Sequence, residues 1–153
     1  MTSDDLDQLK KTAATEAAEF IRNGMVVGLG TGSTATPPRC RPKLLIDVAI
    51  DGADQVDPQL NLIKGGGGAL LKEKIVAASA KRFIVVVDHT KQVPILGGSF
   101  PLPIEVIPFG WGSTAREIEL LTKSRVVLRE RNGGPFLTEA GHFIVDVHLD
   151  RIT

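Results

Sequence analysis

Two carboxylates, Asp51 and Asp54, follow the apolar run that ends at Ile50. They stand three residues apart at the C-terminal end of an expected strand, which is where ligands of open α/β sheets bind. Carboxylates at such positions also cap turns through their own backbone, and that alternative stays open from these two residues alone. The next segment favours a site, because Lys64 leads into Gly65–Gly68, whose backbone can approach a ligand closely.

Glu73 lies on the helix that is expected after these glycines. Its neighbours at helical spacing are apolar and mostly small, namely Ala69, Val76, Ala77 and Ala80. A carboxylate on such a packed face is desolvated, which destabilises its charged form and makes it a stronger base. The alternative is a surface glutamate paired with Lys72 or Lys74.

A loop rich in glycine and hydroxyl groups, residues 28–34, follows the apolar run 25–29. The backbone N–H groups of such a loop can converge on a phosphate at a helix N-terminus. Ser33 stands where a dinucleotide fingerprint needs glycine, and the loop lacks the Gly-Lys-Ser/Thr ending of a P-loop. The loop therefore indicates a small phosphate ester, with an ordinary turn as the alternative.

Two lysines could add positive charge to this region. Lys10 falls within the apolar stripe of the first expected helix, so it either extends along the edge of the stripe into water or points at a ligand. Lys91 follows the expected strand 83–87 and should emerge at the same sheet edge as the paired aspartates, although by itself it reads as a solvated lysine. His89, His142 and His148 are interpreted as structural or exposed, and no histidine partner is identified for Cys40.

The elements that must position these residues alternate along the first hundred positions. The short apolar runs 25–29, 44–50 and 83–87 are typical of buried parallel strands. Helical spacing extends from Ser3 to Gly24, and a second helix is expected over 69–82. The pattern predicts an α/β fold with a Rossmann-like, mostly parallel sheet and flanking helices.

The pattern changes after Pro103. Strands are expected over 104–107, 126–129 and 142–149, with a helix over 113–122, and the last run alternates between two faces as a half-buried strand does. We therefore expect an α/β domain over residues 1–103 and an incomplete α+β subdomain over residues 104–153.

Composition excludes several classes of protein. The 153 residues include 18 Lys and Arg and 18 Asp and Glu, so no overall field attracts nucleic acid or an anionic membrane. The acidic start differs from the basic start of a signal peptide, and no apolar run approaches the roughly 18 residues that cross a bilayer. A single cysteine allows no intramolecular disulfide, so a cytoplasmic location is expected.

Four blocks of sequence, in this order, resemble the motifs of A-type ribose-5-phosphate isomerases. They are residues 28–34, residues 50–54, residues 63–67 with 73–75, and residues 87–91. The resemblance implies an aldose-ketose isomerase of the pentose phosphate pathway that interconverts ribose 5-phosphate and ribulose 5-phosphate through an enediolate, without a metal or organic cofactor. It also implies an oligomer, with a homodimer favoured.

The resemblance assigns roles to matched positions. Glu73 would be the base that moves a proton between C2 and C1, and Asp51 would serve ring opening and the hydroxyl proton transfers. Asp54 would position the substrate, and Lys64 would stabilise charge on the oxygens. The phosphate and hydroxyl contacts would come from Lys10, Thr31, Gly32, Ser33, Thr34 and Lys91. Proton abstraction beside a carbonyl does need a carboxylate base and a fixed partner for the oxyanion.

The chain departs from the family in three places. Thr34 is followed by a short segment, 35–43, where parallel strands need a crossover of about a dozen residues or more, and Pro37 and Pro38 stop any helix begun at the glycine loop. We therefore expect an internal deletion of at least one βα unit, and also a shortened C-terminus. Gln55 stands where the family usually has glutamate. The alternative function is a non-catalytic phosphosugar-binding remnant or an inactive truncated form.

Overall fold

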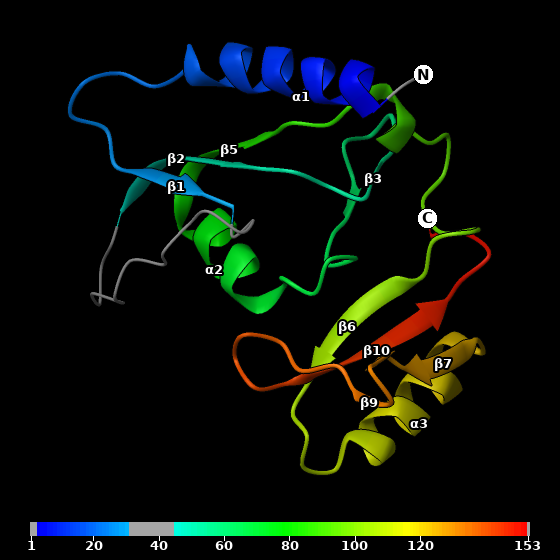
Figure 1. The fold of residues 1–153 in the computed structure, drawn as a ribbon. Helices are drawn as coiled ribbons and strands as arrows, with labels where there is room; N and C mark the ends of the chain where they lie inside the picture. The colour runs from blue at the N-terminus through cyan, green and yellow to red at the C-terminus, as the bar shows by residue number, and fades with distance from the viewer. Residues whose placement is uncertain (1–2, 31–44, 153) are drawn as a thin grey trace. The chain divides into compact units, whose positions relative to one another are not determined.

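A computed structural model describes residues 3–30 and 45–152 (Figure 1). Thr31, Gly32, Ser33, Thr34 and the expected deletion near 35–43 lie outside the described residues. The chain divides into two compact units, of which unit 1 comprises residues 1–53 and 72–92, and unit 2 comprises residues 54–71 and 93–153. The chain thus passes between the units at three points, whereas the sequence pattern places one boundary after residue 103; that domain division stays a prediction.

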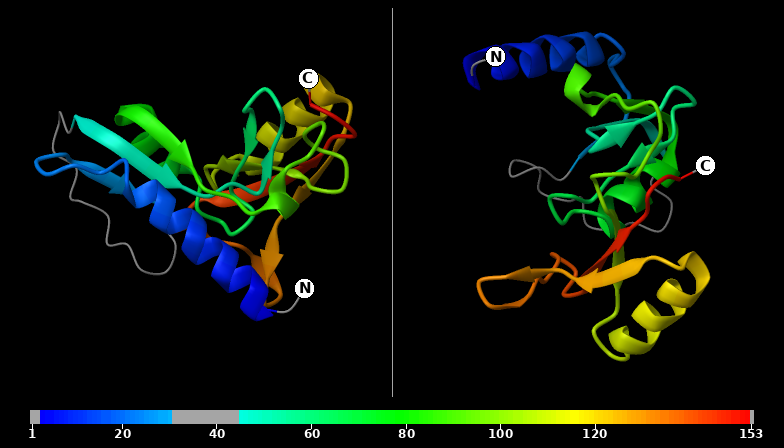
Figure 2. Two further views of the ribbon diagram at one scale, coloured as in Figure 1. Left: turned by 90° about the horizontal axis from the view of Figure 1, so that it is seen from above. Right: turned by 90° about the vertical axis from the view of Figure 1, so that its right-hand side faces the viewer.

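Unit 1 is built on a parallel sheet. Its strands β1 (Val27–Leu29), β2 (Ile46–Asp51) and β5 (Ala80–Val85) lie in the order β1-β2-β5, and both neighbouring pairs are parallel. Helix α1 (Ser3–Ala18) lies on one side of this sheet and α2 (Leu71–Ser79) on the other, as Figures 1 and 2 show. The predicted α/β class with a parallel sheet and flanking helices is confirmed.

The core of this sheet is its central strand. Ile46, Val48 and Ala49 of β2 are at most 3% exposed, as expected for a parallel strand covered on both faces. Gly28 of β1 allows a close approach of α2, because a Cβ atom there would lie 2.6 Å from Cγ1 of Val76. The glycine of the predicted phosphate loop therefore also has a packing role.

The first helix ends earlier than its apolar spacing predicts. After Ala18 the chain tightens into turns in which Phe20 N–H donates to the Ala17 carbonyl and Ile21 N–H to the Ala18 carbonyl, at 3.3 and 3.0 Å. Phe20 and Ile21 are about 40% exposed, so little burial opposes the loss of helical hydrogen bonds.

Unit 2 contains a small hairpin and an antiparallel sheet with one helix. The hairpin pairs β3 (Gln55–Val56) with β4 (Leu62–Ile63). The sheet has the order β6-β10-β7, formed by β6 (Leu102–Val106), β7 (Arg125–Leu128) and β10 (Phe143–His148). Helix α3 (Trp111–Thr122) packs against this sheet, where the rings of Trp111 and Phe143 meet edge to face at 6.5 Å.

The central strand β10 supplies the core of unit 2. Ile144, Val145 and Val147 are fully buried. The expected two-face alternation therefore holds only in part, because strict alternation puts Ile144 on the same face as the polar Asp146 and His148. A second hairpin, β8 (Glu130–Arg131) with β9 (Gly134–Pro135), follows β7. Its turn residues Asn132 and Gly133 have φ of 56° and 80°, the conformation of a type I′ turn.

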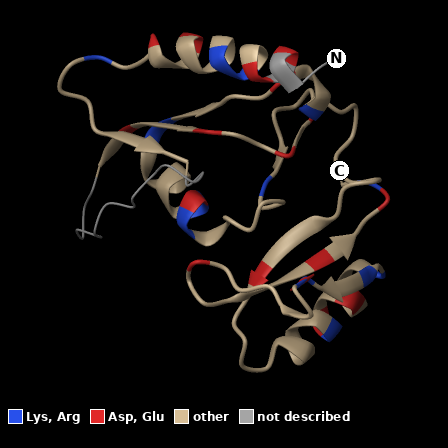
Figure 3. Cartoon of the chain, in the orientation of Figure 1, with Lys and Arg blue, Asp and Glu red and all other residues tan. Residues whose placement is uncertain are grey.

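The described part of the chain shows no region in which charges of one sign dominate (Figure 3). Lys and Arg are interspersed with Asp and Glu over the elements drawn in Figure 3. Among the described helices, none is long and apolar enough to cross a membrane.

Candidate active site

Asp51 closes strand β2 at the C-terminal edge of the parallel sheet. Its Oδ1 accepts a hydrogen bond from the Gly52 N–H at 2.8 Å, so this carboxylate does cap its own turn. The residue that follows β1, Gly30, must be a glycine, because a Cβ atom there would lie only 2.0 Å from Asp51 Oδ1. Gly30 N–H also donates to the Ile50 carbonyl at 2.9 Å, which fixes the glycine loop against the end of β2.

Glu73 stands in the first turn of α2 and is only 8% exposed. The predicted packed face is therefore confirmed, and the alternative of a surface glutamate is wrong. The side chains one turn further along, Val76 and Ala77, are half-buried.

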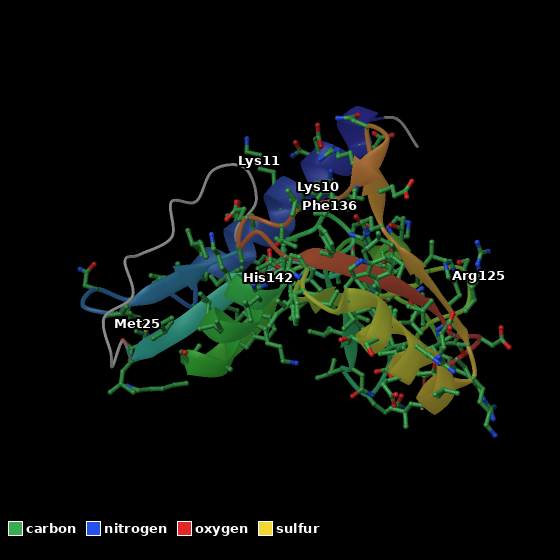
Figure 4. All side chains as sticks on the ribbon, turned by 90° about the horizontal axis from the view of Figure 1, so that it is seen from below. Lys10, Lys11, Met25, Arg125, Phe136 and His142 are labelled. Carbon is green, nitrogen blue, oxygen red and sulfur yellow. The ribbon has the colours of Figure 1, made fainter. Side chains whose placement is uncertain are left out.

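Lys10 and Lys91 line the same cavity in unit 1, although they are far apart in the sequence. The cavity has a volume of about 310 Å³ and is lined by Lys10, Ala13, Ala53, Val86, Val87, Asp88 and Lys91. Lys10 Nζ lies 3.4 Å from Asp7 Oδ1, and both side chains are more than half exposed, so this ion pair contributes little stability. Lys11, in contrast, extends outward from α1 (Figure 4).

Lys91 is carried by a short 3₁₀ turn, η1 (His89–Lys91), which Asp88 caps. The Asp88 carboxylate accepts hydrogen bonds from the Thr90 hydroxyl and, at 2.8 Å, from the Thr90 N–H. The bond from the Thr90 hydroxyl is the largest cause that holds the pKa of Asp88 below its ordinary value. Asp88 therefore stays charged at neutral pH, caps the turn that carries Lys91 and lines the same cavity.

In unit 2, Asp54 is held by the glycine loop. Its Oδ2 accepts a hydrogen bond from the Gly66 N–H at 2.7 Å. No side chain fits at Gly66, because a Cβ atom there would lie 2.8 Å from both Asp54 Oδ1 and Cζ of Phe100. The missing side chain at Gly66 thus allows a close approach of the Asp54 carboxylate, while the approach of this loop to a ligand stays a prediction.

Lys64 enters the same region through the β3–β4 hairpin. Gln55 pairs with Ile63 in this hairpin, and the Asp54 N–H donates to the Ile63 carbonyl at 2.8 Å, so Asp54 and Lys64 continue the two paired strands. The hairpin loop is organised by the buried Asp57, which accepts hydrogen bonds from the N–H groups of Gln59 and Asn61 and from the Asn61 side-chain amide.

The predicted site residues are thus divided between the units. Lys10, Asp51, Glu73 and Lys91 belong to unit 1, and Asp54 and Lys64 belong to unit 2. His142 contacts Glu105 at 3.0 Å, whereas His89 and His148 are exposed, which confirms the structural or exposed reading of the histidines. Among the described residues, no three side chains of the metal-binding types gather as a metal site would require.

Sequence reasoning missed the side chains of the second unit that hold the site loops. Arg129 donates to the carbonyls of Gly65 and Gly66, and Glu105 accepts from the N–H of Leu71, the first residue of α2. A signal was available, since Arg129 and Asp146 are charged residues in otherwise apolar strand segments, and buried charges in proteins are usually paired.

Comparisons with known proteins agree with these motifs. The family described as Ribose 5-phosphate isomerase A (phosphoriboisomerase A) matches residues 39–153. The ribose-5-phosphate isomerase A of Bradyrhizobium diazoefficiens is 44% identical over 193 residues, covering 97% of this chain and 80% of the relative. That of Gloeobacter violaceus is 46% identical over 184 residues, covering 97% and 80%.

Two solved structures extend the similarity to the fold. A ribose 5-phosphate isomerase from Plasmodium falciparum has a TM-score of 0.87 at 30% identity and covers 95% of this chain and 80% of its own. A D-ribose-5-phosphate isomerase in complex with phospho-erythronic acid has a TM-score of 0.85 at 38% identity, covering 96% and 81%.

The alignment lengths also bear on the expected deletion. Since 97% of 153 residues is about 148, the 193-residue alignment with the Bradyrhizobium relative contains about 45 positions that this chain does not fill. A gap of that size matches the loss of at least one βα unit. With the family's motifs, its fold and its sequence along almost the whole chain, this protein belongs to the ribose 5-phosphate isomerase A family.

Proposed function

We propose that this shortened chain retains the isomerase reaction of its family and interconverts ribose 5-phosphate and ribulose 5-phosphate. The observation that carries the proposal is the burial of Glu73 at the start of α2, which holds a carboxylate base away from bulk water. The cavity with Lys10 and Lys91 supplies positive charge for the phosphate in the same unit.

The reaction follows from these groups in three steps. Asp51 moves the hydroxyl proton that opens the furanose ring and frees the C1 aldehyde. Glu73 then takes the proton from C2, and the electron pair moves through the C1–C2 bond to the aldehyde oxygen, giving the enediolate. Glu73 then returns the proton to C1, and Asp51 passes the O2 proton to O1, which leaves the C2 carbonyl and the C1 hydroxyl of the ketose. No proton is gained or lost overall, so the reaction is balanced without an external oxidant.

The remaining residues stabilise and orient the intermediate. Lys64 places a positive charge beside the enediolate oxygens, where it is worth more in the transition state than in the ground state. Asp54 accepts from substrate hydroxyls and fixes the pose, while Thr31, Gly32, Ser33 and Thr34 with the two lysines hold the phosphate. The related enzyme with phospho-erythronic acid supports this reading, because a carboxylate beside a hydroxylated carbon resembles an enediolate in shape and charge.

The test is Glu73→Gln, which keeps the shape of the side chain and removes the base. Turnover of ribose 5-phosphate, followed as ribulose 5-phosphate in a coupled assay, should fall by at least about 100-fold, since general base catalysis contributes 10²–10⁴-fold. Lys74→Gln, one residue further at an exposed position, is the matched control and should keep full activity. An active Glu73→Gln enzyme would remove Glu73 from the mechanism.

A second candidate function is phosphosugar binding without turnover. The roughly 45 unfilled positions favour it, because they remove part of the scaffold that must hold catalytic groups to within about 0.5 Å. Calorimetric titration with ribose 5-phosphate would then show saturable binding while the coupled assay stays at background. Detectable turnover by the wild-type chain excludes this candidate.

We also propose a homodimer in the cytoplasm as the working state. The family is typically oligomeric, and a chain with a single cysteine, which can form no intramolecular disulfide, suits a reducing compartment. Light scattering of the purified chain should give a mass near twice 16.4 kDa. A monomeric, active enzyme would show that the dimer is not required.

A further inference from the structure

The peptide group between Gly65 and Gly66 is hydrogen-bonded at both ends. Its N–H, on Gly66, donates to Asp54 Oδ2 at 2.7 Å, and its carbonyl, on Gly65, accepts from Arg129 Nη1 at 2.9 Å. The same nitrogen of Arg129 also donates to the Gly66 carbonyl at 3.0 Å. One guanidinium thus contacts two successive carbonyls of the loop that holds the Asp54 carboxylate.

Arg129 is itself fixed by Asp146 on the neighbouring strand. Its Nε donates to Asp146 Oδ2 at 2.8 Å, and its Nη2 donates to Asp146 Oδ1 in a second hydrogen bond. The two side chains are only 16% and 15% exposed, and the bidentate geometry leaves the guanidinium little freedom to rotate. The third nitrogen of the fork is therefore presented to the glycine loop in a defined direction.

The glycine loop cannot fix itself by side chains. Gly65 and Gly68 have φ of 97° and 96°, a conformation that side-chain-bearing residues rarely adopt, and Gly66 has no room for a Cβ atom. The Gly68 N–H donates to the Gly65 carbonyl at 3.0 Å, which closes the loop locally. Any further restraint on the 65–66 peptide must come from another segment, and Arg129 supplies it.

We propose that Arg129 is a positioning residue that acts on Asp54 through the 65–66 peptide group. A cation at the carbonyl polarises the peptide and strengthens its N–H as a donor, because hydrogen bonds in a chain reinforce one another. The Asp54 carboxylate is then held in place by a chain of hydrogen bonds, here called the relay, which runs from Asp146 through Arg129 and the 65–66 peptide to Asp54. The catalytic part of this inference rests on the proposed function; the relay itself does not.

The competing role for Arg129 is purely structural, as a buried ion pair that ties β7 to β10. Loss of such a pair would lower stability and leave the Gly66–Asp54 hydrogen bond as it is. The two roles are separated by a readout at Gly66 itself. The amide proton of Gly66 reports the strength of its bond to Asp54 through its chemical shift and its rate of hydrogen exchange.

The experiment compares Arg129→Lys with Arg125→Lys in the full chain, using ¹⁵N-labelled protein. Lysine keeps the charge but cannot contact Asp146 and two carbonyls at once. Arg125 begins β7, and Arg129 directly follows the end of that strand. The Arg125 side chain is exposed (Figure 4), so it is the matched control. We expect the Gly66 amide proton to move upfield and exchange at least about 10-fold faster in Arg129→Lys, and to be unchanged in Arg125→Lys.

Two further tests follow, and the first keeps the inference falsifiable if Arg129→Lys folds poorly. Asp146→Asn leaves the guanidinium in place but loosens it, and should shift the Gly66 amide in the same direction by a smaller amount. In an Asp54→Asn background, Arg129→Lys should no longer alter the affinity for phospho-erythronic acid measured by calorimetry, because the residue through which it acts is already neutral.

The kinetic consequence is a loss of kcat/KM of up to about 100-fold in Arg129→Lys, the size expected from misplacing a contact group by about 1 Å. If the wild-type chain does not turn over ribose 5-phosphate, the proposed function fails and the Gly66 amide still decides the relay. An unchanged Gly66 amide in Arg129→Lys, or additive effects of Arg129→Lys and Asp54→Asn on affinity, would overturn the proposal.

Discussion

The two units of this protein hold their site residues in different ways. In unit 1, Asp51 and Glu73 are placed by the backbone, by the register of the parallel sheet and by the start of α2. In unit 2, backbone groups in and around the site loops are held by side chains. Arg129 donates to the carbonyls of Gly65 and Gly66, Glu105 accepts from the Leu71 N–H, and Gln55, next to Asp54, pairs with Gly97. The site residues of unit 1 are thus positioned by steric fit, and those of unit 2 by hydrogen bonds between buried polar groups.

This difference determines how each unit should respond to substitution. A tightly fitted site loses function when a single atom is added, because the neighbouring group must move to make room for it. A buried polar network loses stability when one partner is removed, because the groups left behind are desolvated and unpaired. The predictions below use this contrast, from the largest expected effect to the smallest.

Glu105→Ala should be the most damaging change in unit 2. Glu105 Oε2 accepts from the Leu71 N–H at 2.9 Å, and Oε1 contacts the Thr138 hydroxyl and His142 Nδ1 at 2.8 and 3.0 Å. Removing it leaves three groups without this partner in a region where the Glu105 side chain is 9% exposed, at a cost of about 3–5 kcal/mol. Urea unfolding measures this cost, and Glu130→Ala at an exposed position is the control.

In unit 1, Gly30→Ala should cause the largest loss of activity that the addition of a single carbon atom can produce. A Cβ at residue 30 would lie 2.0 Å from Asp51 Oδ1 and must displace the carboxylate, so kcat/KM should fall on the order of 100-fold. Gly52→Ala is the matched control, since its Cβ would meet only the Val86 carbonyl at an ordinary 3.7 Å. Equal activity of the two alanine variants would show that the Asp51 position is not what the steric fit protects.

Gln55→Glu tests whether unit 2 depends on pairing rather than on shape. The buried Gln55 amide donates to the Gly97 carbonyl at 3.2 Å and accepts from the Gly97 N–H at 2.8 Å, and an ionised glutamate of the same size can only accept. We expect a loss of about 1–3 kcal/mol at neutral pH. A protonated glutamate can donate again, so the loss should shrink as pH falls, whereas Gln59→Glu on the surface should show neither effect.

Sequence patterns found the residues of unit 1 better than those that support unit 2. The order of strands and helices and the burial of Glu73 follow from local periodicity. The expectation that Lys10 and Lys91 contact one ligand comes from the family resemblance alone. The contacts of Arg129 with Gly65 and Gly66 join segments more than sixty residues apart, and no local pattern encodes such a pair. From the sequence, Gln55 is only a departure from the family's usual glutamate. Its two hydrogen bonds with the backbone of Gly97 are visible only in the folded chain.

The smallest expected effect is on the stability of the protein in acid, and it comes from Asp57 in the β3–β4 hairpin. The hydrogen bond from the Asn61 side-chain amide is the main cause that holds the pKa of Asp57 below its ordinary 3.8 in the folded state. Between the folded-state pKa and 3.8, Asp57 is more often protonated in the unfolded chain than in the folded one. The stability that Asp57 contributes is therefore complete above pH 3.8 and is lost as pH falls through the lower, folded-state pKa.

Asp57→Asn removes this titration and should therefore be less stable than the wild type at pH 6 and approach it below pH 3.8. Urea midpoints measured across that range test the difference, with Asp150→Asn as an exposed control whose midpoint should follow the wild type throughout. A constant difference between Asp57→Asn and wild type at every pH would mean that the hairpin loop needs the shape of Asp57 and not its charge. The β3–β4 hairpin would then resemble the sterically fitted edge of unit 1 more than the polar network around it.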